Sequence, residues 1–488
     1  MFPLRRLIYR AFPLNSDEIG DGRREYPKKP AGESIRRREM KLNYLKAEGR
    51  RFLWKGREIL LRGWALGSWM NFEHFMIGLP GTDSQIRGAF QEVYGSERAE
   101  IWLDRMLECM AGEADLVYLK RLGINSIRIP FSYTHLMDDR HPEAFRKKGF
   151  ERLDRVIQLC GKHELFVILD LHAAPGSQNP DWHSDNLNGQ SLFWKYRVFQ
   201  DQTVRIWQEL AARYAENPWV AGYDIINEPG YGISSADIND FYSRIIQAIR
   251  EKDPNHILFL EGTDFGRDFT LLEKQSDPNI AYTVHFYPFV LEEDILDPAM
   301  DTVKRRDIFT RIFDRQLVAV TRLERPVWCG ESGYEIPDGQ EAFRASLLME
   351  NISLCESRGI SWNLWTYKDA RCMGIVVPKK DSDWMRLAGE IEKKWSHHRE
   401  EKISGILTRE MGSRFYAPLA ESLAYDLDFQ VRAVLHEIAV EQVLKPMLRQ
   451  IPWERMKHYP ESFSFDRCDR REQVTEQIRA FIAERNRS

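Results

Sequence analysis

Residues 114–129 read ADLVYLKRLGINSIRI, and residues 150–171 read FERLDRVIQLCGKHELFVILDL. Each stretch begins with apolar residues at helical spacing and ends with a short apolar run of strand character. A helix followed by a strand, repeated along the chain, is typical of a parallel sheet. These two stretches therefore predict an α/β fold.

The same alternation extends through most of the chain. Further strand-like runs are Ile59–Leu61, Ala221–Ile226, Ile257–Leu260, Ile280–Val284, Pro326–Cys329 and Ile360–Leu364. Helical periodicity recurs between most of them, at Phe199–Tyr214, Ile238–Ile249, Ile308–Val320 and Glu341–Cys355. Eight such units favour a closed (β/α)8 TIM barrel over an open sheet. No G-x-G-x-x-G follows the first strand, so a dinucleotide fold is disfavoured.

The pattern divides the chain into three parts. Residues 1–46 form a polar, basic leader, residues 47–398 the barrel, and residues 399–488 a helical C-terminal extension. Within the barrel, residues 71–112 are too long for a simple βα loop and contain a helical stretch at Glu100–Met110. We expect this insertion to build part of the active-site rim.

Composition excludes several classes of protein. Of the 488 residues, 43% are hydrophobic and 12% aromatic, which is enough for a large core and excludes a disordered or fibrous chain. The net charge of −4 argues against nucleic-acid binding through a strongly basic surface. No apolar run approaches the roughly 18–20 residues that a membrane span needs.

The six cysteines and the N-terminus bear on localisation. The cysteines lie far apart, with no C-x-x-C pair and no zinc-finger spacing, and predict buried thiols in a reducing compartment. The first residues carry scattered arginines where a secretory signal would have an apolar core. We therefore expect a cytoplasmic protein without a metal or cofactor, and the sequence does not predict its oligomeric state.

Two glutamates follow predicted strands. Glu228 ends the run Asp224-Ile225-Ile226-Asn227-Glu228, and Glu331 ends Trp328-Cys329-Gly330-Glu331. A carboxylate directly after a buried strand is costly unless it is used, and functional groups of a barrel lie where its strands end. Two such carboxylates are the groups needed to cleave a glycosidic bond.

The other strand ends are also polar or aromatic. An inward Arg can keep a carboxylate ionised, an Asn can bind a sugar 2-hydroxyl, a Tyr can orient the nucleophile and an indole can support a pyranose ring. The residues in question are Arg128, His172, Asn227, His285, Tyr287 and Trp365. Each alone has an ordinary structural explanation, so the prediction depends on their joint occurrence. Glu261, which ends the fifth strand, is interpreted as structural.

This ordered set, with Asn227-Glu228-Pro229 and Glu331, resembles glycoside hydrolase family 5 over residues 59–385. The segment 61–69, LRGWALGSW, is similar to the family pattern R-G-x-N-L-G-x-W, from which Trp64 and Ala65 depart. The resemblance implies a retaining double displacement, with Glu228 as acid/base and Glu331 as nucleophile. The two carboxyl groups should then lie about 5–5.5 Å apart.

This mechanism requires a particular charge state. Glu228 must be protonated and Glu331 ionised. We expect Arg128 and Tyr287 to lower the pKa of Glu331, and the charge of Glu331 to raise the pKa of Glu228.

The substrate is less defined. Residues 172–179, HAAPGSQN, resemble the H-x-A-P-G-S-Q-N segment of exo-acting β-glucanase and β-glucosidase-like members. The following loop, with Trp182, would wall off one end of a cleft, and Lys368 and Asp369 are candidate hydroxyl ligands. The sequence therefore predicts exo action on short glycosides or oligosaccharides.

Other substrates and other classes of protein stay open. An endo-acting β-glucanase or mannanase and a glycosidase for a glycolipid-type aglycone fit the same motifs. A metal-dependent hydrolase is disfavoured because no H-x-H follows the first strand and no H-E-x-x-H occurs. A catalytically silent carbohydrate-binding barrel is disfavoured because both glutamates are present.

Overall fold

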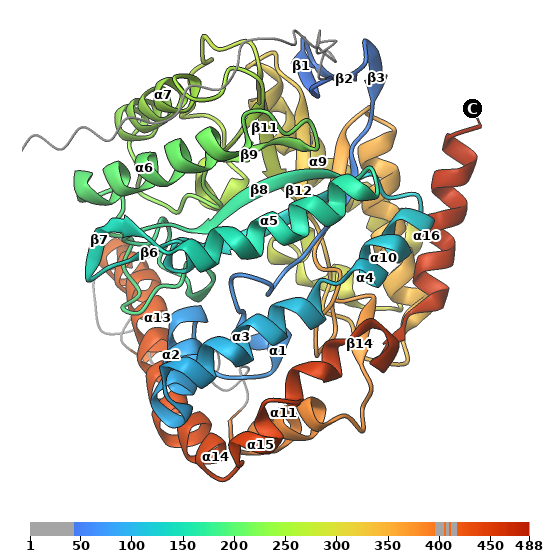
Figure 1. Ribbon diagram of the computed structural model, residues 1–488. Helices are drawn as coiled ribbons and strands as arrows, with labels where there is room; N and C mark the ends of the chain where they lie inside the picture. Colours follow the sequence, from blue (N-terminus) through green and yellow to red (C-terminus); the bar gives the residue numbers. More distant parts are fainter. Residues whose placement is uncertain (1–42, 396–404, 407–408, 411–416, 488) are drawn as a thin grey trace, which may run out of the picture. The chain divides into compact units, whose positions relative to one another are not determined.

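The computed structural model describes residues 43–395, 405–406, 409–410 and 417–487, and side chains are described for all of these except 417–425 (Figure 1). Residues 1–42 of the predicted leader, and most of residues 396–416, lie outside the described residues. The boundaries proposed for the three parts of the chain stay predictions.

Eight parallel strands form a closed barrel (Figure 1). The last strand pairs with the first, through Trp362 beside Arg62 and Leu364 beside Trp64. The barrel confirms the predicted (β/α)8 fold. Its strands are β4 (Arg62–Ala65), β5 (Ser126–Ser132), β8 (Phe166–Ala173), β9 (Val220–Asp224), β10 (Ile257–Glu261), β11 (Ile280–His285), β12 (Val327–Glu331) and β13 (Ser361–Leu364).

The first barrel strand differs from the prediction. The run Ile59–Leu61 was expected to form it, but Ile59 ends β3 (Arg57–Ile59) of a separate antiparallel sheet with β1 (Lys46–Glu48) and β2 (Arg51–Trp54). Barrel strand β4 begins instead at Arg62, whose charge is neutralised by Glu356, with Nε 2.6 Å from Oε1. Because its charge is paired, Arg62 can begin a barrel strand at a position where the apolar pattern predicted none.

The small sheet closes the amino-terminal end of the barrel. Phe52 of β2 packs on Phe259 of β10, with ring centroids 6.0 Å apart, and both belong to a buried cluster with Phe166 and Trp328. Apolar side chains fill this end of the barrel. The polar candidate residues therefore have space only at the opposite end.

Helices follow most barrel strands. They are α4 (Glu113–Arg121), α5 (Lys147–Lys162), α6 (Arg197–Tyr214), α7 (Ser235–Arg250), α9 (Thr302–Thr321), α10 (Glu341–Glu356) and α11 (Asp383–Lys394). The alternation is less regular than predicted, because only the short α8 (Thr263–Gly266) lies between β10 and β11. Short strands β6 (Met137–Asp138) and β7 (His141–Phe145) pair with each other before α5.

The last helix, α16 (Glu472–Arg485), packs on the barrel beside α10 and α4 (Figure 1). Tyr118 of α4 donates a 3.1 Å hydrogen bond to Thr475, and Ile482 packs so closely on Gly123 that a Cβ there would lie 2.7 Å from it. The end of the predicted extension therefore covers the barrel wall.

Residues 71–112 build three helices, α1 (His74–Ile77), α2 (Asp83–Tyr94) and α3 (Ser96–Met110). The rest of the extension packs on them, and the Tyr94 hydroxyl donates to the carbonyl of Leu448 over 2.7 Å. This part comprises α13 (Ala417–Ala439), the π-turn η5 (Val440–Leu444), α14 (Lys445–Arg449), α15 (Trp453–Met456) and η6 (Tyr459–Phe463). Strand β15 (Cys468–Arg470) pairs with β14 (Val376–Pro378).

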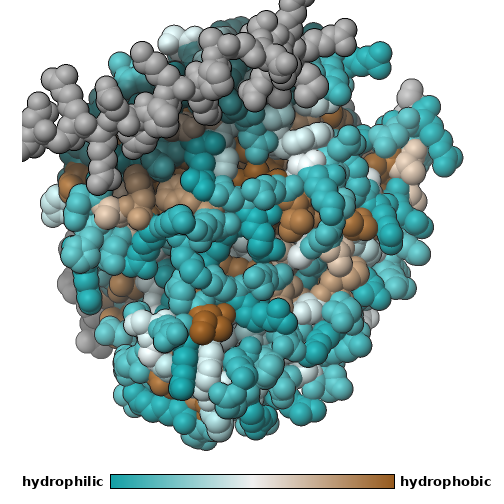
Figure 2. Space-filling model, viewed as in Figure 1, coloured by the Kyte–Doolittle hydropathy of each residue, from teal (hydrophilic) through white to brown (hydrophobic). Residues whose placement is uncertain are grey.

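The surface and the thiols agree with a protein that folds around one large core. Hydrophilic residues cover most of the face shown in Figure 2. All six cysteines are free thiols, and five of them are buried. Among the described residues, no helix combines the length and the apolarity that crossing a membrane requires.

Candidate active site

A cavity of about 370 Å³ opens at the carboxyl ends of the barrel strands. This is the end at which functional groups of a (β/α)8 barrel lie. Six of the residues singled out from the sequence line the cavity together: Glu228, Glu331, His172, His285, Tyr287 and Trp365. Trp182, from the turn η2 (Trp182–Ser184), lines it as well.

The two glutamates face each other across this cavity. Glu331 ends β12 and Glu228 follows β9. One carboxylate oxygen of each lies, with a ring nitrogen of His285, in a group whose atoms are all within 4.8 Å of one another. Retaining glycosidases have carboxyl groups about 5–5.5 Å apart, whereas inverting enzymes need about 6.5–9.5 Å to admit a water. The separation therefore fits a retaining reaction.

Glu331 is held by a cation and a phenol. Arg128 of β5 donates to one carboxylate oxygen, and the Tyr287 hydroxyl donates to Oε2 over 2.9 Å. Arg128 is fully buried and also pairs with Asp224 at 3.0 Å and Asp170 at 3.2 Å. Burial and the charge of Glu331 raise the pKa of Tyr287 well above its ordinary value, so the hydroxyl stays a donor.

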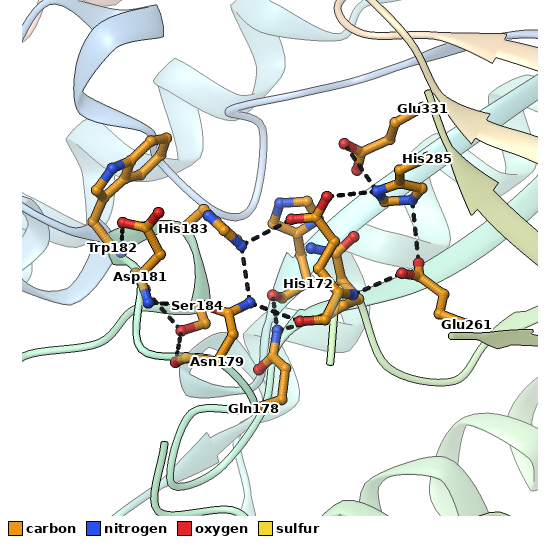
Figure 3. A network of polar contacts seen from close by, with 12 residues as sticks. His172, Gln178, Asn179, Asp181, Trp182, His183, Ser184, Glu261, His285 and Glu331 are labelled. Atoms are coloured by element: carbon orange, nitrogen blue, oxygen red, sulfur yellow. Dashed lines mark hydrogen bonds and ion pairs between the residues drawn. The ribbon is translucent and has the colours of Figure 1, made fainter. Parts of the chain in front are cut away.

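Every polar atom of Glu228 has a partner. Its N–H donates to Glu261 over 2.7 Å, and its carbonyl accepts from Asn179 over 2.9 Å. Its Oε1 lies 2.7 Å from Nδ1 of His285, and its Oε2 lies 3.0 Å from Nε2 of His183. Figure 3 shows the two imidazoles on opposite sides of this network.

The predicted charge state of Glu228 is wrong for this arrangement. Burial alone would raise its pKa, but the hydrogen bonds and positive charges of His183 and His285 hold the pKa of Glu228 well below its ordinary value. The sequence prediction considered only the repulsion by Glu331. The pKa of Glu228 is therefore shifted in the direction opposite to the predicted one.

Glu261 contacts three groups of this network. Its buried carboxylate accepts the Glu228 N–H, lies 3.3 Å from Nε2 of His285 and lies 3.4 Å from Arg128. Glu228 has a positive φ of 49°, a conformation that a residue with a side chain rarely adopts. The hydrogen bond to Glu261 fixes the backbone in that conformation and so aims the Glu228 side chain.

His172 forms the floor of the cavity with Trp365. The two rings stack at 6° with centroids 5.1 Å apart. Nδ1 of His172 lies 2.8 Å from Asp170, and Nε2 lies 3.5 Å from Glu73. Burial would lower the pKa of His172, but Asp170 and Glu73 raise it to about 10. The floor therefore presents a cation beside an indole.

Asn227 lies beneath the cavity. Its Oδ1 accepts from Arg128 over 2.9 Å, and its side chain is fully buried. Its amide nitrogen finds no hydrogen-bond partner among the described residues. Asn227 is not among the residues that line the cavity, so its predicted contact with a sugar hydroxyl stays a prediction.

Lys368 and Asp369 do not reach the cavity, which corrects their prediction as sugar ligands. Lys368 is buried against α4, where Nζ lies 2.6 Å from Asp115 and donates to the Phe463 carbonyl over 2.8 Å. Asp369 is fully buried and accepts the N–H groups of Arg371 and Met373. Both residues hold the loop after β13 rather than substrate, because a buried charge there needs fixed partners.

Several cavity residues were not predicted. Glu73 lies in the insertion predicted to form the rim, and His183 lies in the loop predicted to wall off one end of the cleft. Nothing in their local sequence distinguishes them from their neighbours. Phe429 comes from α13 in the predicted extension. The apolar lining also includes Phe75, Phe265, Phe289, Val290 and Met373.

The fold and the paired glutamates define a barrel enzyme that cleaves glycosidic bonds. The family model described as cellulase (glycosyl hydrolase family 5) matches residues 88–371, and the chain belongs to this family. It is 38% identical to a β-xylosidase of Phanerodontia chrysosporium over 357 residues, which cover 70% of this chain and 75% of that protein.

Two further relatives match shorter segments. A probable glucan 1,3-β-glucosidase A of Emericella nidulans is 28% identical over 41% of this chain and 50% of its own. Endoglucanase C of Acetivibrio thermocellus is 29% identical over 36% of this chain and 50% of its own. Among solved structures, endoglucanase Cel5A of Thermotoga maritima matches with a TM-score of 0.47 at 17% identity, over 67% of this chain and 93% of that one.

These comparisons confirm the predicted family and the predicted class of enzyme. The protein is an O-glycosyl hydrolase that acts on β-glycosidic bonds with retention. A catalytically silent barrel is therefore no longer a competing explanation. Its substrate is a carbohydrate, whose donor sugar the comparisons leave open.

Proposed function

We propose that the protein is an exo-acting β-glycosidase that removes a terminal sugar from short glycosides. The supporting observation is an aromatic wall on one side of the cavity. Trp182 packs against His74 and Phe75 of α1, with ring centroids 4.5 and 5.4 Å apart, and Phe429 of α13 lines the same cavity. A wall of this kind leaves room for a chain end rather than for a chain that passes through.

Glu331 is the proposed nucleophile. Its carboxylate attacks the anomeric carbon while Glu228 passes a proton to the glycosidic oxygen, and the bond between that carbon and oxygen breaks. The glycosyl group is then joined to Glu331. Glu331 loses its negative charge when the ester forms. Arg128 and the Tyr287 hydroxyl, which bind the Glu331 carboxylate in the free enzyme, are then free to orient the ester.

Glu228 acts as a base in the second half of the reaction. It removes a proton from a water molecule, whose oxygen attacks the anomeric carbon and displaces Glu331. Trp365, which lines the cavity and stacks on His172, lies where it can bind the sugar during both steps.

Release of nitrophenol from aryl glycosides tests this proposal. The panel contains the β-xyloside, β-glucoside, β-mannoside, β-galactoside and α-arabinofuranoside, because two relatives are named for xylose and glucose. We expect one β-glycoside to be cleaved by wild type and by Glu209→Ala, a control on the exposed face of α6, but not by Glu331→Ala. Activity that survives in Glu331→Ala would contradict the assignment of the nucleophile.

Exo action has its own test. Reduced oligosaccharides of three to five sugars should lose one sugar at a time from the non-reducing end. Early appearance of internal fragments, with silence on the aryl panel, would show an endo-acting enzyme instead.

A glycoside with an apolar aglycone is a second candidate. Tyr231 follows β9, as Glu228 does, and Phe265 follows the adjacent strand β10; both line the cavity, with ring centroids 5.4 Å apart. The leaving group must lie near Glu228, so an apolar aglycone would contact these side chains. We expect KM for alkyl glycosides to fall as the alkyl chain lengthens, and a constant KM would argue for a sugar as the leaving group.

A further inference from the structure

His183 lines the cavity from the turn η2 and contacts one carboxylate oxygen of Glu228, whereas His285 contacts the other. Its Nε2 lies 3.0 Å from Oε2 of Glu228, within hydrogen-bond distance. The His183 side chain is 12% exposed, whereas that of His285 is 1% exposed. Of the two imidazoles that contact Glu228, His183 is therefore the one that can exchange protons with the cavity.

The loop that carries His183 is fixed to Glu228. Oδ1 of Asn179 accepts the Asp181 N–H over 3.0 Å, and Nδ2 donates to the Glu228 carbonyl over 2.9 Å. On the other side, Nδ2 of Asn71 donates to the His183 carbonyl over 2.9 Å. The imidazole and the carboxylate are thus positioned by shared contacts, and their separation does not depend on substrate.

Asn179 can also donate a hydrogen bond to His183 once His183 has lost its Nε2 proton. Its Nδ2 lies 2.9 Å from Nε2 of His183 and carries a second hydrogen besides the one given to Glu228. While His183 holds a proton on Nε2, its positive ring lies 3.0 Å from Oε2 of Glu228. Once the proton has gone, the Nε2 lone pair can accept the second N–H of Asn179. The neutral imidazole therefore has a partner as well.

The charges around His183 favour its protonated form in the free enzyme. The groups that face it are Glu228 at 3.0 Å, Asp181 beside its own turn, His172 of β8, whose ring centroid is 5.9 Å away, and the buried Glu73. Burial and His172 lower the pKa of His183, but the hydrogen bond and charge of Glu228, with Asp181, raise it above its ordinary value overall.

We propose that His183 holds on Nε2 the proton that Glu228 delivers to the glycosidic oxygen, and that it regains this proton in the second half of the reaction. The proposal rests on the role proposed above for Glu228. His183 is a positioning residue that acts through Glu228 and does not itself attack the sugar.

The protons balance over the cycle. In the first half, the Nε2–H bond of His183 breaks, Oε2 of Glu228 takes the proton, and the leaving oxygen receives it as its bond to the anomeric carbon breaks. In the second half, Glu228 takes a proton from water and passes it to Nε2. The enzyme ends with the proton where it began, and one water has been consumed.

The test compares a phenyl glycoside, which needs its leaving oxygen protonated, with a 2,4-dinitrophenyl glycoside, which does not. We expect His183→Gln to lose roughly tenfold or more in kcat/KM on the phenyl substrate, because this reaction needs general acid catalysis. The loss on the dinitrophenyl substrate should be far smaller. The basic limb of the phenyl pH profile should also move to lower pH. The control is His141→Gln, whose side chain is 72% exposed.

Equal losses on both substrates with an unmoved basic limb would overturn the proposal and leave His183 a purely structural role. Glu228→Gln separates this failure from a failure of the proposed function. If Glu228→Gln keeps full activity on the phenyl glycoside, the acid/base assignment itself is wrong.

A second measurement does not require a His183 variant to fold. Nuclear magnetic resonance of ¹⁵N-histidine-labelled protein follows the titration of the imidazoles in wild type and in Glu228→Gln. We expect one cavity imidazole besides His285 to titrate at lower pH once the Glu228 charge is removed. Unchanged titration of every imidazole except His285 would overturn the proposal.

Discussion

The N–H of Glu228 donates a 2.7 Å hydrogen bond to Oε2 of Glu261, a carboxylate that no substrate can reach. This contact joins the ends of two neighbouring barrel strands, and it holds Glu228 at a positive φ of 49°. A side chain in that conformation is aimed by its backbone, and small errors in the placement of a reacting group are costly in rate. Glu261 therefore sets the direction of the proposed acid/base.

The first prediction concerns Glu261→Gln. The amide can still accept the Glu228 N–H, but it removes the negative charge beside His285. We expect kcat to fall by roughly tenfold while KM changes little, because the cavity lining is intact. Steady-state kinetics on the best aryl glycoside measure this, with Glu209→Gln as the control. A rise in KM at constant kcat would contradict a positioning role.

The second prediction separates Lys368 from sugar binding. Its ammonium and the Asp115 carboxylate are both 2% exposed and lie 2.6 Å apart. Removing one member of a buried pair leaves an unpaired charge and costs about 3–5 kcal/mol. We expect Lys368→Met to lose that much in the free energy of unfolding, measured in urea, and to keep its KM. Lys380→Met, at a side chain that is 81% exposed, should change stability by less than about 0.5 kcal/mol.

Much of the candidate site could be predicted because barrel geometry brings strand ends together. His172, His285 and Glu331 lie far apart in the sequence, yet each is part of a different barrel strand and lines one cavity, and the buried Arg128 of a fourth strand contacts Glu331. Their local sequence, a polar residue at or near the end of a buried apolar run, makes each a candidate, and their joint occurrence carries the prediction.

The same reasoning failed for Lys368 and Asp369, which lie four and five residues beyond the end of β13. Lys368 follows β13 closely, but its partner Asp115 is about 250 positions away, and no local pattern reports that pairing. Phe429 reaches the cavity from a helix far downstream of the barrel strands. The pKa of Glu228 depends on His183, whose approach is decided by the path of a loop. Contacts of this kind follow from tertiary structure alone.

The third prediction concerns alkaline pH. The pKa of His172 is raised from an ordinary value near 6.5 to about 10. The stability that its ion pairs supply is fully present below pH 6.5 and is lost as the pH rises toward 10, because only the folded protein still holds this proton. We expect the wild-type free energy of unfolding to fall between pH 6.5 and 9.5.

This fall should be steeper than that of His172→Gln by up to about 1.4 kcal/mol per pH unit. Urea unfolding at several pH values measures both slopes, and His141→Gln serves as the control. Parallel slopes in wild type and His172→Gln would show that His172 is not protonated in the folded protein.

The fourth prediction concerns α16, which packs on the barrel wall beside α10. Ile478 of α16 is fully buried in the main core, and its neighbours Val474 and Ile482 are buried with it. If α16 is part of the cooperative fold, Ile478→Ala should cost about 2–5 kcal/mol, as in the core of any domain. Ile438→Ala, at a side chain that is 50% exposed, is the matched control and should cost little. Urea unfolding followed by both tryptophan fluorescence and circular dichroism should then give one transition that shifts as a whole. Two separate transitions, with only the smaller one shifted, would mean that α16 unfolds independently and that the barrel is stable without it.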